Sequence, residues 1–160
     1  MLLIGLVITL STSGPSTSGA RDQWEQRTFD SYQMVINVNP ALCRSEYIVT
    51  DEIISQIITL TPTPTGCINL TYTISDLFQM INDFQPGQCG PNGCACDGAV
   101  IMAANYDSGL GYPVRIKTFL DLSHRWHYPG YWISLLFGSA CSQVGYIGTT
   151  IEVISLTPLP

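Results

Sequence analysis

The chain has 160 residues, of which 11% are charged and 46% hydrophobic, and its formal net charge is −6. This length suits a single domain with a sizeable core, and the apolar composition excludes an intrinsically disordered chain. The six basic residues form no basic run, so the charge that drives nucleic-acid binding is missing from this chain. We therefore expect no basic RNA-binding arm. Because so little charge covers the surface, we expect burial against copies of the same chain.

The first twenty residues differ in composition from the rest. Residues 1–10 (MLLIGLVITL) are apolar and uncharged, and residues 11–20 are rich in Ser, Thr and Gly. One interpretation is a signal peptide ending near Ala20. The other is a buried N-terminal strand followed by a flexible linker. The apolar run is shorter than the roughly 20 residues that span a bilayer, so no transmembrane segment is predicted. A single β-sandwich domain is predicted over residues 21–160.

Short strands separated by Gly and Pro dominate the chain. Alternating apolar and polar residues predict strands over 33–39 and 67–73. The isoleucine-rich stretch 46–60 predicts two strands, or one strand with a bulge at Asp51-Glu52. Further strands are expected over 133–137 and 144–147 with 150–156, whereas residues 114–122 fit either a strand or a short helix.

One helix is predicted, over residues 75–84 (SDLFQMINDF). Ser75 suits the N-cap, and Asp76 is favourable near the positive end of the helix dipole. Leu77, Met80 or Ile81, and Phe84 share one face, which we expect to pack against the core.

The apolar run 98–105 (GAVIMAAN) is long enough for a strand buried on both faces, with the other strands packed around it. Many short strands and one helix indicate a mainly β protein. We expect an antiparallel β-sandwich or jelly roll with one short helix at about 75–84.

Six cysteines allow fifteen pairings, namely Cys43, Cys67, Cys89, Cys94, Cys96 and Cys141. Disulfides would imply an oxidising compartment, whereas buried free thiols would pack as small hydrophobic groups. Both interpretations stay open. Cys89, Cys94 and Cys96 could also form part of a zinc or iron–sulfur site, but only one imperfect half of the usual spacing is present. Disulfides or packed thiols are therefore favoured.

Other candidates for chemistry are few. His124 and His127, with Asp121, could lie on one helical face as metal ligands, but hydrogen-bonded loop histidines fit their aromatic surroundings better. A Ser-His-Asp or Cys-His mechanism would need one of these two histidines, and no nucleophile motif accompanies them. Asp97 and Asp107 could bind calcium, although aspartates beside glycine more often stabilise turns. We predict no catalytic residue and no cofactor.

Two surface features stand apart from catalysis. Asn69 begins an N-glycosylation pattern, which matters only in a secreted protein. The aromatic residues Trp126, Tyr128, Tyr131 and Trp132 are candidates for a subunit interface, where Tyr and Trp are enriched, or for a sugar-binding patch.

Three segments resemble the shell domain of small icosahedral RNA virus coats, of the tombusvirus and sobemovirus kind. Residues 44–51 (RSEYIVTD) are similar to the first strand of that jelly roll. Residues 98–107 (GAVIMAANYD) resemble its Gly-x-Val-x-Met-Ala-x-x-Tyr-Asp strand. Residues 145–153 (GYIGTTIEV) with the closing Leu156-Thr-Pro158 are similar to its last strand. The resemblance implies a coat protein that assembles with copies of itself.

The leading hypothesis is a non-enzymatic structural protein that self-assembles through a β-sandwich, most concretely a viral capsid subunit located in the virion. The alternative is a secreted, extracellular, disulfide-stapled binding module, toxin or effector. An extracellular hydrolase using His124 or His127 ranks below both.

Overall fold

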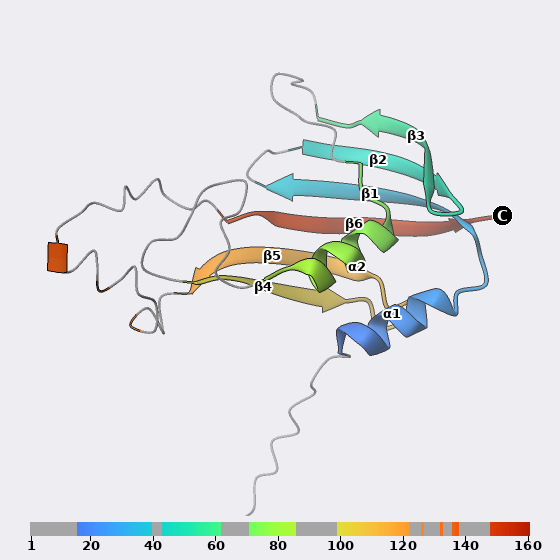
Figure 1. The fold of residues 1–160 in the computed structure, drawn as a ribbon. Coiled ribbons are helices and arrows are strands. Elements are labelled where there is room, and N and C mark those ends of the chain that lie inside the picture. Colours follow the sequence, from blue (N-terminus) through green and yellow to red (C-terminus); the bar gives the residue numbers. More distant parts are fainter. Residues whose placement is uncertain are drawn as a thin grey trace, which may run out of the picture.

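The computed structural model describes residues 16–39, 43–61, 71–85, 99–121, 126, 132, 136–137 and 148–160. Along the chain the elements are α1 (Thr17–Glu25), β1 (Ser31–Asn39), β2 (Cys43–Thr50), β3 (Ile53–Thr59), α2 (Ile74–Asp83), β4 (Ala99–Tyr106), β5 (Pro113–Asp121) and β6 (Thr150–Leu159). The six strands form one antiparallel sheet in the order β3-β2-β1-β6-β5-β4 (Figure 1). The prediction of a mainly β, antiparallel protein is confirmed.

The sheet consists of two three-stranded meanders joined side by side. Strands β1, β2 and β3 form one, and β4, β5 and β6 form the other. The join is the pairing of β1 with β6, which places Ser31 opposite Leu159. Each strand thus pairs with a sequence neighbour except at this one junction. The finer prediction of jelly-roll connectivity is not confirmed.

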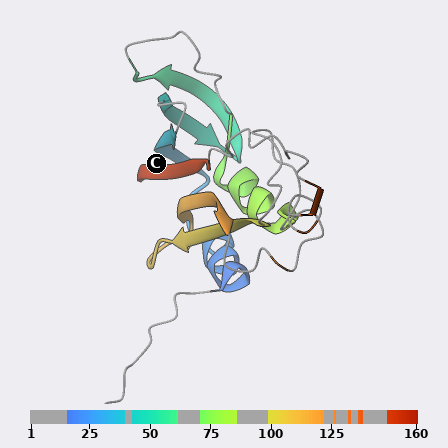
Figure 2. The same cartoon turned by 90° about the vertical axis from the view of Figure 1, so that its left-hand side faces the viewer.

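Both helices cover the same face of the sheet. Tyr32, the first buried residue of β1, meets them both: the Trp24 ring of α1 packs edge-on against the tyrosine ring at 5.4 Å, and the N–H of Ile74 in α2 donates to its hydroxyl at 3.1 Å. Burial alternates along β1, as one covered face requires. Figure 2 shows α2 lying on one side of the sheet. The second layer that the structure describes is therefore helical.

The predicted helix at 75–84 is confirmed as α2, but its start was predicted wrongly. Thr73, not Ser75, is the N-cap, because its side chain accepts from the N–H of Asp76 while the Asp76 carboxylate accepts from the N–H of Thr73. This reciprocal pair is a capping box. Phe78 on the buried face of the helix stacks on Tyr106 of β4 at 6.1 Å.

The helix α1 was not predicted, and it begins inside the Ser/Thr/Gly-rich stretch for which two interpretations were left open. Its N-cap is Ser16, whose hydroxyl accepts from the N–H of Gly19 at 3.3 Å. Ala20 and Trp24, one turn apart, are fully buried. Residues 16–20 are therefore part of the described fold, in a stretch that one interpretation gave as a flexible linker and the other as the end of a signal peptide.

The strand predicted at 98–105 is confirmed as β4, but its central position is wrong. Among the described strands β4 pairs only with β5, at one edge of the sheet. Val100 is buried, whereas Ala103 and Asn105 are exposed. Alanine costs little to expose, so an apolar run rich in alanine can lie at an edge. Strand β1, by contrast, has neighbours on both sides and an alternately buried face.

The remaining strand predictions divide into three groups. Strands at 33–39, on both sides of Asp51-Glu52 and at 150–156 are confirmed, and residues 114–121, predicted as either strand or helix, form a strand. Residues 71–73 are not in a strand, and Leu136 and Phe137 are helical, so those predictions are wrong there. Residues 1–15, 67–70 and 144–147 lie outside the described residues.

Candidate interaction edge and its anchor

The outer edge of β3 is the most exposed apolar feature of the sheet. Among the described strands β3 pairs only with β2. Ile53, Ile58 and Leu60 are exposed by 69%, 39% and 42%. Residues 53–60 (IISQIITL) contain no charge and no proline, although natural edge strands are usually protected by such residues. We call residues 53–60 the β3 edge; it lies along the upper border of the sheet in Figure 1.

The opposite edge of the sheet, β4, is better covered. Its sequence is also uncharged, but Met102, Ala104 and Tyr106 pack against the core, and Tyr106 lies under Phe78. Its hydroxyl donates to or accepts from Thr17 of α1 at 2.7 Å. Both helices therefore support β4, whereas only Ile54 and Ile57 of β3 pack against the core.

The β3 edge begins at a strained turn. Asp51 and Glu52 have φ angles of 51° and 57°, and they connect the paired residues Thr50 and Ile53. A two-residue hairpin with positive φ at both positions is a type I′ turn, for which Asn-Gly is typical. Residues with a Cβ are disfavoured in this conformation by roughly 1–2 kcal/mol each. Something must hold the turn in place.

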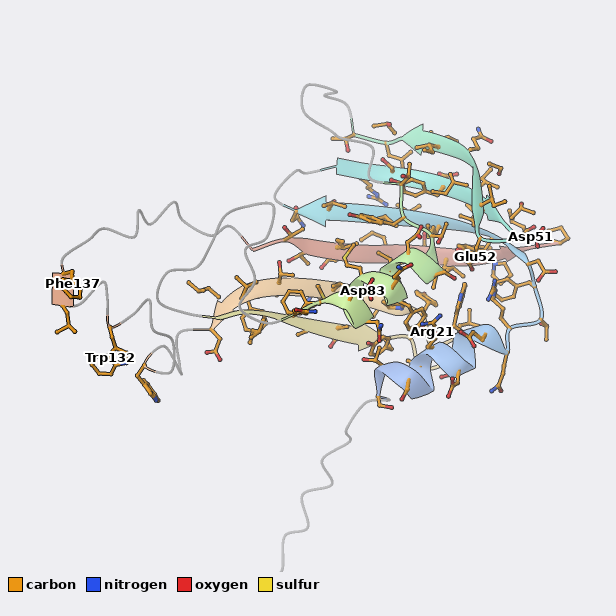
Figure 3. The ribbon with its side chains drawn as sticks, viewed as in Figure 1. Arg21, Asp51, Glu52, Asp83, Trp132 and Phe137 are labelled. Carbon is orange, nitrogen blue, oxygen red and sulfur yellow. The ribbon has the colours of Figure 1, made fainter. Side chains whose placement is uncertain are left out.

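Three contacts to Glu52 hold it. Oε1 of Glu52 accepts from Nη2 of Arg27 at 2.9 Å. Oε2 accepts from the Tyr32 hydroxyl at 3.1 Å and from the backbone N–H of Ser75 at 3.2 Å. We call Arg27, Tyr32 and Glu52 the anchor cluster. Through these contacts the cluster joins the start of β3 to β1, to the residues that follow α1 and to the start of α2; Figure 3 labels Glu52 near the end of the sheet.

The anchor cluster places the Glu52 carboxylate between a guanidinium, a phenol and a helix N-terminus. A carboxylate is favourable at a helix N-terminus, and Ser75 belongs to the first turn of α2. Burial raises the pKa of Tyr32 well above its ordinary value, and the neighbouring Glu52 charge raises it further, so the phenol stays neutral and donates. The Arg27 guanidinium lies 4.4 Å from the centre of the Trp24 ring.

The contacts of the anchor cluster fit a structural role. Both Glu52 oxygens are engaged, and the Tyr32 hydroxyl donates to one and accepts from Ile74. In the sequence, Asp51-Glu52 was recognised only as a strand boundary, and the contacts of Glu52 with Arg27 and Tyr32 were not predicted. An acidic pair inside an isoleucine-rich stretch was the available signal, because a buried acid needs partners.

Most of the predicted metal and disulfide candidates lie outside the described residues. These are Cys67, Cys89, Cys94, Cys96, Cys141, His124 and His127, as well as Asp97 and Asn69. Cys43 is the first residue of β2. Within the described ranges no group of three His, Cys, Asp or Glu residues could hold a metal ion. The cysteine predictions stay predictions.

Asp107 is a turn residue, as one of its two interpretations predicted. Its Oδ1 accepts from the N–H of Gly109 at 3.0 Å and of Leu110 at 2.7 Å. The turn is also tied to α1, because Nε2 of Gln23 donates to the carbonyl oxygens of Ser108 and Gly109 at 3.1 and 2.7 Å.

Two of the four predicted aromatic interface residues are described. Trp126 and Trp132 are each about half exposed, and Nε1 of Trp132 donates to the carbonyl oxygen of Trp126 at 2.8 Å. Figure 3 shows Trp132 and Phe137 well away from the sheet. Tyr128 and Tyr131 lie outside the described residues. An interface or sugar-binding role for these aromatics stays a prediction.

Neither helix in the described part of the chain is long and apolar enough to cross a membrane. In comparisons with protein-family models, curated proteins and solved structures, no match was found for this chain. The resemblance to viral coat proteins is therefore not tested by these comparisons and stays a prediction.

Proposed function

We propose that this protein is a non-enzymatic structural subunit that associates with copies of itself through the β3 edge. The observation that carries the proposal is the exposure of an uncharged, isoleucine-rich edge strand whose described pairing is with β2 alone. The outer side of such a strand presents backbone N–H and C=O groups that another strand can pair with.

The anchor cluster supports this role. It fixes the first residues of β3 through Glu52, so the edge is held in an extended conformation before a partner arrives. A preorganised edge loses less conformational entropy on pairing than a flexible one would. The strained turn is thus compatible with a strand kept ready for association.

The most specific form of the proposal is a viral capsid subunit located in the virion. It is supported by the three segments that resemble coat-protein strands. The first covers most of β2, the second contains β4, and the third extends into β6. In this form the β3 edge would be one of several contacts between copies, and the assembled species would be a large particle.

The proposal is tested by placing a charge on the edge. Ile58→Lys should leave the fold intact, because residue 58 lies opposite Glu46 on the neighbouring strand β2. A lysine at 58 would therefore face an opposite charge. The same lysine opposes pairing with a second strand. The matched control is Ile154→Lys, since Ile154 is also exposed but lies in β6, in the middle of the sheet and away from the β3 edge.

The measurement is sedimentation velocity over a range of protein concentrations. We expect the wild type and Ile154→Lys to associate, and Ile58→Lys to remain monomeric with unchanged circular dichroism. A wild type that is monomeric throughout, or an Ile58→Lys variant that associates as the wild type does, would refute the proposal.

The six cysteines favour a second candidate, the secreted binding module with disulfides. The intact mass of the native protein, measured with and without reductant, tests it. Paired thiols together with loss of the N-terminal residues would support secretion, whereas free thiols in the native protein would contradict a disulfide-stapled module.

A further inference from the structure

Resting on the proposed self-association, we infer that the second copy pairs antiparallel with β3 about a two-fold axis, so that two six-stranded sheets become continuous. In this arrangement the acidic turn of each copy faces Arg44 of the other. The partner is thus a second copy of this chain in one defined orientation.

The β3 edge carries no charge, which suits pairing with an identical strand about a two-fold axis. A two-fold axis between antiparallel strands pairs each residue with one of the other copy, equally far from the axis on the opposite side. A charged residue at the axis would then lie opposite the same residue of the other copy, and like charges placed opposite each other are destabilising. Residues 53–60 contain no charge, and their two ends, at Ile53 and Leu60, are both apolar and exposed.

Residues of opposite charge flank the two ends of the uncharged β3 edge. At one end lies Asp51, which is exposed. At the other lies Arg44, whose carbonyl oxygen accepts from the N–H of Leu60 at 2.8 Å and whose N–H donates to Oγ1 of Thr61 at 2.7 Å. Arg44 is exposed as well, and it forms no ion pair with another described residue.

The polarity of the edge selects the antiparallel arrangement. Glu52 is already paired with Arg27, so Asp51 is the acid of this turn that remains for a partner. Antiparallel pairing brings Asp51 of each copy toward Arg44 of the other, giving two attractive contacts. Parallel pairing would place the two acidic turns together and leave both arginines at the far end. Opposite charges that approach in this way set orientation more than affinity.

The orientation is tested by charge reversal. Arg44→Glu and Asp51→Lys should each weaken the dimer by about tenfold or more, because each replaces two attractive contacts by two repulsive ones. The double variant Arg44→Glu/Asp51→Lys should recover the wild-type dissociation constant. An equimolar mixture of the two single variants should form the mixed dimer, in which both contacts are attractive again.

Sedimentation equilibrium with one copy fluorescently labelled measures the homodimers and the mixed dimer. The milder Arg44→Gln and Asp51→Asn variants guard against misfolding, since Asn tolerates the positive φ at residue 51. They should weaken the dimer without abolishing it, and thermal unfolding of each variant should match the wild type.

The outcomes separate the two proposals. A monomeric wild type refutes self-association itself. A dimeric wild type that Ile58→Lys disrupts, but that neither charge reversal weakens or the double variant fails to recover, supports the β3 edge and overturns the antiparallel orientation. A mixed dimer of Asp51→Lys with wild type that is tighter than either homodimer, with no weakening by Arg44→Glu, identifies the parallel arrangement and overturns the inference.

Discussion

The hydroxyl of Tyr32 donates to Oε2 of Glu52 over 3.1 Å and accepts from the N–H of Ile74 over the same distance. One phenol in β1 thus connects the β2–β3 turn to the first turn of α2. Because Tyr32 and Ile74 are both fully buried, the N–H of Ile74 depends on this hydroxyl for a partner that water cannot replace, whereas Glu52 also accepts from Arg27 and Ser75.

Two arginines that both pair with glutamate should differ in their effect on stability. Arg27 and Glu52 are only 14% and 23% exposed, whereas Arg21 and Glu25 are 52% and 58% exposed. Arg27→Ala should lower the free energy of unfolding by about 2 kcal/mol, since it leaves a partly buried carboxylate without its cation. Arg21→Ala should lower it by no more than about 0.5 kcal/mol. Urea unfolding measures both, and equal losses would contradict a buried anchor.

Stability should decline in alkali because of Tyr32. Its pKa in the folded protein is raised, first by burial, above the value of about 10 that it has in an unfolded chain. The contribution is therefore complete below about pH 10 and is lost as the pH rises beyond that, where only the unfolded state releases the proton readily. Tyr32→Phe should flatten this decline in urea unfolding measured from neutral to alkaline pH. A Tyr32→Phe variant with the wild-type slope would rule out this source.

Glycine should have opposite effects at the two turn positions. Asp51→Gly should raise the free energy of unfolding by about 0.5–1 kcal/mol, because glycine adopts positive φ without strain. Glu52→Gly relieves the same strain but removes the contacts to Arg27, Tyr32 and Ser75, so it should lower stability by about 1–2 kcal/mol. Thermal unfolding of the two variants gives the sign of each change. Stabilisation by both would show that the Glu52 contacts contribute little.

Gly111 should tolerate no side chain. Its φ is +79°, and an added Cβ would lie 2.2 Å from the carbonyl oxygen of Ala20 in α1. Gly111→Ala should cost at least about 2 kcal/mol. Gly109→Ala is the matched control in the same turn, since its nearest contact would be 3.4 Å, to Oδ1 of Asp107; it should change stability by no more than about 0.5 kcal/mol. A loss of stability at Gly111 as small as the one at Gly109 would mean that α1 can move away from the turn.

The parts of the fold that the sequence predicted correctly have local causes. The helix α2 has an apolar stripe and one acidic residue, Asp76, in its first turn, and burial alternates strictly over the nine residues of β1. The split at Asp51-Glu52 was also visible, because two acidic residues interrupt an isoleucine-rich stretch. By contrast, α1 begins inside a Ser/Thr/Gly-rich segment, and its signal was the single buried pair Ala20 and Trp24.

The rest depends on contacts between distant residues. No local pattern shows that β4 lies at an edge, because strand order is decided by which strands pair, and β6 pairs with β1 from the other end of the chain. The anchor cluster is hidden for the same reason, since Glu52 meets Arg27 and Tyr32 only after the sheet forms. Exposure of the β3 edge likewise follows from its place in the sheet.

The attachment of α1 to the tip of the β4–β5 hairpin has a consequence for how the chain acquires its structure. Gln23 and Thr17 reach partners at Gly109 and Tyr106, far along the chain, and Ser31 pairs with Leu159. The first helix therefore lacks its contacts with the β4–β5 hairpin while a ribosome is still producing the middle of the chain, although Trp24 can already meet Tyr32. Topologies with such long-range closure fold slowly. During that interval the apolar β3 edge has already been synthesised. A chaperone that covers it would protect the nascent chain from aggregation.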